Sequence, residues 1–168
     1  MGSQYLAGQD TLNGDVGIDT LTATNLSYLA GGGAFGGTTG VEKVSVGQGD
    51  ATFSGTGTGA NTAGINDYTL TGNMSSNIEM TDLLNNVRVS TSDNGGAATD
   101  FTLGLATAGG TANFSSTLSA NSDFGVFSTV NVGTLNVTTA DSQIVGTPTL
   151  TLGGSGVFMG DASLTTLN

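Results

Sequence analysis

Asp10 and Asp19 hold the same place in two short phrases that recur nine residues apart, at residues 8–12 and 17–21. In each phrase a glycine stands two positions before the aspartate, and a leucine stands two positions after it. Glycine permits a tight turn whose carbonyl groups can face a metal, and aspartate adds a hard oxygen ligand of the kind that calcium prefers. The leucine would begin a short strand facing a core. The spacing therefore predicts calcium-binding turns near the N-terminus.

Residues 14–22 extend this match to the nonapeptide G-G-x-G-x-D-x-U-x of calcium-binding parallel β-rolls, in which U is a large apolar residue. Asp15 stands where that pattern has its second glycine, and residues 5–13 lack the first two glycines. A full site needs ligands from two successive turns, and these residue types are common in the chain, so purely structural turns are the alternative. The candidate calcium ligands and turn residues are Gly8, Asp10, Gly14, Asp15, Gly17 and Asp19.

The composition excludes several classes of function. The 168 residues include no histidine and no cysteine, which rules out Cys/His zinc sites, disulfides and histidine-based catalysis. Only Lys43 and Arg88 are basic against 13 acidic residues, so the net charge is −11. Nucleic acid and anionic membranes are therefore poor partners. No apolar run approaches the roughly 20 residues that span a bilayer, so we expect no membrane insertion.

The elements that must position these turns are short strands. Gly, Thr, Ser and Asn make up about half the chain, and apolar residues alternate with hydroxyl or amide residues in short runs, which is typical of half-buried strands. Strong helix formers are scarce, and only residues 77–86 are predicted to form a short helix. Gly-rich residues 31–37, 55–59 and 94–96 are predicted turns or loops. The expected strands are 41–46, 51–54, 68–71, 87–91, 100–105, 112–118, 129–138, 149–152 and 163–167.

Apolar positions also recur over longer distances. Val44, Val87 and Val130 are spaced by 43 residues, and two neighbouring sets of apolar residues share this spacing. A 43-residue repeat would correspond to two coils of about 21–22 residues, a coil length that suits a parallel β-solenoid. Chance alignment of frequent Val-x-Val pairs is the alternative. We expect an all-β fold, an irregular right-handed parallel β-helix or β-solenoid with a short calcium-binding β-roll at the N-terminus.

The tandem Gly-x-Asp-Thr-Leu phrases, followed by Thr/Ala/Asn-rich text such as VEKVSV and VGTLNVT, resemble RTX-type proteins exported by type I secretion. More narrowly, the chain resembles bacterial surface-layer proteins and the giant adhesins related to them. The specific motif covers only residues 5–22. The resemblance implies a secreted, calcium-dependent, self-assembling protein of the bacterial cell surface, with Asp10 and Asp19 as side-chain ligands. Family members with the clearest calcium rolls carry five or more intact repeats, whereas this chain carries fewer than two.

We expect residues 1–3 to be an expression remnant, residues 4–22 to form the calcium-binding turns, and residues 23–168 to form one elongated solenoid segment of a longer protein. The predicted function is structural: self-association with calcium into a surface layer or filament, with a cell-surface polysaccharide as a further candidate partner. The alternative is a ligand-binding module of a large adhesin or an autotransporter-like passenger. With no tryptophan and two cations, the chain is not expected to be an enzyme.

Overall fold

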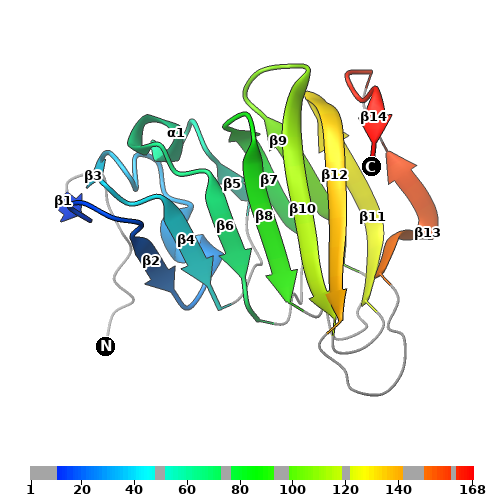
Figure 1. Cartoon of the computed structure of the whole chain (residues 1–168), viewed down its shortest axis with the longest axis horizontal. Helices are drawn as coiled ribbons and strands as arrows, with labels where there is room; N and C mark the ends of the chain where they lie inside the picture. The colour runs from blue at the N-terminus through cyan, green and yellow to red at the C-terminus, as the bar shows by residue number, and fades with distance from the viewer. Residues whose placement is uncertain are drawn as a thin grey trace.

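The computed structural model describes residues 11–47, 52–72, 77–92, 99–118, 122–141, 150–159 and 162–168. Two large sheets face each other along the length of the molecule (Figure 1). The front sheet has the order β14-β12-β10-β8-β6-β4-β2, and the back sheet has the order β13-β11-β9-β7-β5. The front strands are β2 (Thr20–Ala23), β4 (Lys43–Val46), β6 (Asp67–Leu70), β8 (Val87–Ser92), β10 (Gly110–Leu118), β12 (Val132–Asp141) and β14 (Thr166–Leu167). The back strands are β5 (Thr52–Ser54), β7 (Ile78–Leu83), β9 (Phe101–Leu105), β11 (Ser122–Val130) and β13 (Leu150–Met159).

From β4 onward the chain alternates between the two sheets, and neighbouring strands within each sheet are parallel. Each coil therefore adds one strand to each sheet and stacks on the coil before it, which is the architecture of a β-solenoid. The prediction of an all-β parallel solenoid is confirmed. A further pair, β1 (Thr11–Asn13) and β3 (Gly37–Thr39), lies at the N-terminal end. Within the described ranges, no helix is long and apolar enough to cross a membrane.

The core follows from the alternation of side chains along each strand. Inward rows run from coil to coil, and one row joins Val44, Tyr68, Val89, Phe114 and Val137. The four rings of Phe101, Phe114, Phe124 and Phe127 form one cluster between the sheets, with centroid separations from 5.1 to 6.1 Å. All four are fully buried. These apolar rows hold the two sheets together.

The coils differ in length, and the 43-residue repeat is wrong. Offsets along the row from Val44 to Val137 are 24, 21, 25 and 23 residues. Val44 therefore aligns with Val89 two coils later and not with Val87, while Val130 belongs to the back sheet. The connections between strands absorb most of the differences in length, and the pairing register itself shifts after Gly110, between Phe124 and Val126, and between Met80 and Leu83.

Two predicted elements are corrected by the structure. Residues 77–86 do not form a helix, because Ile78 and Met80 point into the core on either side of exposed Glu79 and make strand β7. Asp82, with φ of 52°, interrupts the pairing of this strand with β9. The predicted strand 129–138 is two strands, since Asn131 adopts a φ of 61° and turns the chain from β11 into β12.

The remaining short elements fill corners of the coils. The 3-10 helix η1 (Leu26–Leu29) buries both of its leucines, and α1 (Ala60–Ala63) follows the predicted turn at residues 55–59. The predicted turn at 94–96 lies outside the described residues. Strands lengthen from 4 residues in β4 to 10 in β12 and from 3 in β5 to 10 in β13, and the two-residue strand β14 ends the front sheet. The molecule is therefore narrower at its N-terminal end (Figure 1).

Candidate functional site: the N-terminal turn and the polar face of the front sheet

The predicted calcium turn at residues 14–19 packs on the turn of the following coil. The Gly14 N–H donates a hydrogen bond to the Thr39 carbonyl at 2.9 Å. A Cβ atom at Gly14 would lie 1.9 Å from the Gly40 carbonyl oxygen, so only glycine fits there. Asp15 and Gly17 both have positive φ, of 63° and 139°. Asp15 thus tolerates the left-handed geometry that the nonapeptide pattern assigns to glycine.

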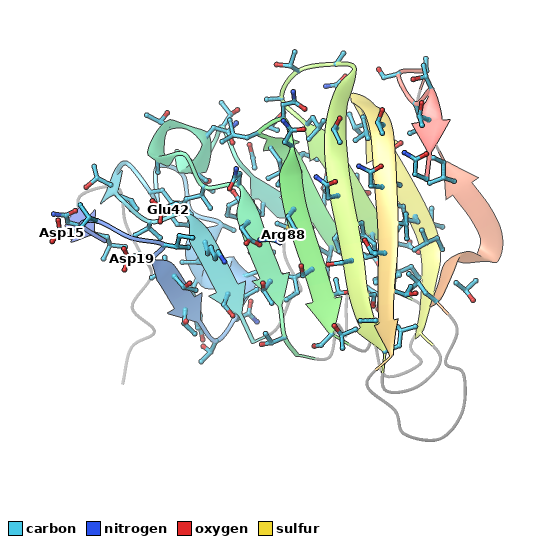
Figure 2. The ribbon with its side chains drawn as sticks, in the orientation of Figure 1. Asp15, Asp19, Glu42 and Arg88 are labelled. Atoms are coloured by element: carbon cyan, nitrogen blue, oxygen red, sulfur yellow. The ribbon has the colours of Figure 1, made fainter. Side chains whose placement is uncertain are left out.

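Asp19 is linked to Glu42 of the next coil. The Asp19 N–H donates to Glu42 Oε2 at 2.9 Å, and the Asp19 carbonyl accepts from the backbone N–H groups of Glu42 and Lys43 at 3.3 and 3.1 Å. Asp15, Asp19 and Glu42 therefore lie at the same end of the molecule (Figure 2). Glu42 could not be assigned to this site from the nonapeptide pattern, because it follows Asp19 by 23 residues and not by nine.

These contacts indicate which oxygen atoms of the turn could act as calcium ligands. A Cβ atom at Gly17 would lie 3.8 Å from Asp19 Oδ2, so the Asp19 carboxylate sits beside its own turn. Glu42 adds a second carboxylate, but one of its oxygens already accepts from the backbone. Across the described ranges, no three acidic side chains converge on a point that could hold a metal. Gly8 and Asp10 lie outside these ranges, and calcium binding by the six candidate residues stays a prediction.

A second polar centre lies on the outer face of the front sheet, around Asp67. The Asp67 side chain is 10% exposed, and its Oδ2 atom contacts Arg88 at 2.5 Å and Lys43 at 3.5 Å. Lys43 and Arg88 flank Asp67 on adjacent strands because the three residues share one register row. They are also the only basic residues of the chain. Both cations are therefore paired with a single carboxylate.

Two groups in and beside this cluster have raised pKa values, each for a different physical reason. The hydrogen bond that Arg88 donates to Asp67, together with the negative charge of Asp67, raises the pKa of Arg88 above its usual value, so Arg88 is always charged. Next to Asp67, Tyr68 points into the core, and its hydroxyl donates to the Ile65 carbonyl at 3.3 Å. Burial raises the pKa of Tyr68 well above its ordinary value near 10. Tyr68 is therefore a neutral core residue.

Amides and hydroxyls continue the polar face beyond the ionic cluster. In the same row, Asn136 Nδ2 donates to Asn113 Oδ1 at 2.9 Å, and Asn168 Nδ2 donates to Asn136 Oδ1 at 2.8 Å. In the next outward row, Ser115 Oγ donates to Ser90 Oγ at 2.8 Å. That row consists entirely of hydroxyl residues: Thr22, Ser45, Thr69, Ser90, Ser115 and Thr138. The front sheet therefore presents ordered rows of polar groups along the axis of the molecule.

A groove of about 570 Å³ lies over the N-terminal ends of the front strands and runs from coil to coil, perpendicular to the strands. Its lining residues are Ile18, Glu42, Lys43, Asn66, Asp67, Asn86, Arg88 and Asn113. Sequence reasoning missed this group, because its members come from five successive coils of unequal length. A usable signal was present, however: Lys43, Asp67, Arg88 and Asn113 each directly precede a large apolar residue of the row that runs from Val44 to Phe114.

No protein-family model matches this chain, and neither a curated protein nor a solved structure was found to match it.

Proposed function

We propose that this chain is a structural segment of a secreted bacterial cell-surface protein, a rod that associates with copies of itself in the presence of calcium. The observation that supports this proposal best is the pairing of both basic side chains with Asp67. The chain has only these two basic side chains against 13 acidic ones, and the positive charge of each is already paired within its own chain, so the chain offers little positive charge to the acidic groups of a neighbouring copy. With a net charge of −11, copies repel one another unless cations lie between them.

The solenoid itself suits a structural role. Its coils stack with parallel strands, and its core is continuous from Leu26 and Val44 to Phe127 and Leu135. Each coil is buried by its neighbours, which gives an elongated and stiff unit instead of a closed catalytic cavity. Divalent cations outside a cell are available at concentrations that can bridge carboxylates. Metal binding that requires the folded turn also adds its free energy to folding.

The test is assembly of the purified chain with calcium and with excess chelator, followed by sedimentation velocity, electron microscopy and circular dichroism. We expect ordered sheets or filaments with calcium and monomers with chelator. Asp19→Asn should weaken calcium-dependent assembly. Glu79→Gln is the matched control, because it removes one negative charge from an exposed residue of the back sheet. A β-rich monomer indifferent to calcium, or equal assembly of both variants, contradicts the proposal.

A ligand-binding module is the second candidate function. The groove on the front sheet is the observation that favours it.

A further inference from the structure

The groove on the front sheet runs along the solenoid axis and not across it. Its residues come from the starts of β4, β6 and β8, from β10, and from the corners that precede β2, β4, β6 and β8, so neighbouring coils contribute at a similar level. Parallel strands are about 4.8 Å apart, and five coils therefore span about 20 Å. Such a site is long and shallow. It suits an extended ligand that makes similar contacts at each coil.

The polar groups of the groove alternate between hydrogen-bond acceptors and donors. Glu42 precedes Lys43 on one coil, Asp67 lies on the next, Arg88 on the third and Asn113 on the fourth. Two carboxylates and two cations give the groove no formal net charge, although the chain as a whole carries −11. A ligand therefore needs no charge of its own to fit this site, and an anionic ligand would gain little from it.

Both cations keep donors that Asp67 does not use. Arg88 has five N–H donors and its side chain is 55% exposed, while Lys43 has three donors and its side chain is 37% exposed. Asp67 holds the two side chains in place over the sheet. Asn66 and Asn86 add exposed amides from the corners of two coils. The site thus offers fixed donors and acceptors at its centre and adaptable amides along its rim.

The lining contains no aromatic ring, so recognition by stacking on a planar base is not available. Ile18, which is 71% exposed, supplies an apolar surface at one end of the groove. A ligand rich in hydroxyl groups can donate to the half-buried Glu42 carboxylate and accept from Arg88, Lys43 and the exposed amides of Asn66 and Asn86, whereas Asp67 and Asn113 already bond within the solenoid. We propose that this groove binds a neutral oligosaccharide lying along the solenoid axis. This inference goes beyond the structural role and does not depend on it.

The test measures binding of three hexasaccharides to the monomer in chelator, by calorimetry and by NMR shifts of the asparagine amides. The three are a neutral β-glucan, a neutral N-acetylglucosamine oligomer and an anionic oligogalacturonate. We expect saturable binding of at least one neutral sugar. Saturable binding of the oligogalacturonate alone, or of none of the three, would overturn the proposal. Because chelator is present, the result is independent of calcium-dependent assembly.

Variants locate the site. Asn66→Ala keeps the hydrogen bond between its coil and the next, because that bond runs from the backbone N–H of Arg88 to the backbone carbonyl of residue 66, at 2.8 Å. Both Asn66→Ala and Arg88→Gln should weaken binding about tenfold, as expected for loss of a hydrogen bond to the ligand. Thr117→Ala, on the exposed face of β10 but outside the groove, should leave affinity unchanged. Equal affinity of Asn66→Ala and the parent chain places the sugar elsewhere and refutes the assignment.

Discussion

Replacing Asp67 by asparagine tests whether the ionic cluster on the front sheet stabilises the fold. Asp67 is 7% exposed and is the only carboxylate within ion-pair distance of Lys43 or Arg88 among the residues that the structure describes. A hydrogen bond to a charged group contributes about 1.5–3 kcal/mol. We lower this to about 1–2 kcal/mol for Arg88, because its side chain is 55% exposed. Lys43, at 3.5 Å, should contribute about 0.2–1 kcal/mol.

Asp67→Asn should therefore reduce the free energy of unfolding by about 2 kcal/mol, a substantial part of the 5–15 kcal/mol typical of a domain. Urea denaturation followed by circular dichroism measures this loss. Double-mutant cycles with Arg88→Met and Lys43→Met separate the two pairs. The coupling of Asp67 with Arg88 should exceed its coupling with Lys43. Coupling energies near zero for both pairs, or the reverse order, would refute the reasoning from contact distance.

Three further predictions concern the core and the N-terminal turn. Phe114→Ala should cost about 3–5 kcal/mol of unfolding free energy, because it removes a buried ring in contact with three others, while outward Thr117→Ala on the same strand should cost far less. Since burial raises the pKa of Tyr68, the unfolded chain loses this proton near pH 10 while the folded chain keeps it. The free energy of unfolding should not depend on Tyr68 below pH 10, and above pH 10 it should fall by up to about 1.4 kcal/mol per pH unit. Tyr68→Phe should remove this pH dependence, which denaturation curves recorded at alkaline pH measure. Gly14→Ala should disrupt the N-terminal turn, because its new Cβ would meet the Gly40 carbonyl. The control Gly32→Ala has open space around its new Cβ and should be tolerated. Hydrogen exchange of the backbone amides of residues 14–19 should be faster in Gly14→Ala and unchanged in Gly32→Ala.

Much of the fold could be predicted from the sequence because strand alternation is a local property. The inward Val44 and Val46 and the inward Val87 and Val89 are visible as period-two patterns without any knowledge of their neighbours. The predicted helix at 77–86 failed for the opposite reason. Its residues fit either structure locally, and pairing with β5 and β9 makes them a strand.

The candidate sites show the same division. The turn at residues 14–19 could be predicted because its glycines and aspartates lie within one nonapeptide. The cluster around Asp67 could not, because its members meet only through the register of coils that differ in length. Lys43 and Arg88 are 45 positions apart in the sequence, and although each directly precedes an apolar residue of the inward row, that local pattern does not indicate which strands pair and hence that both contact Asp67.

The lengthening of the strands toward the C-terminus has a mechanical consequence. In a solenoid the hydrogen bonds between coils run along the long axis, so a pulling force acts on each coil interface in turn. The interface between β4 and β6 is 4 residue pairs long, whereas β10 and β12 are aligned over 9. Under tension the pairing of β12 with β14, only 2 residue pairs long, and the short N-terminal interfaces should open first, while the long β10–β12 interface still holds. The molecule would then extend under load in steps that begin at its ends and reach the β10–β12 interface last.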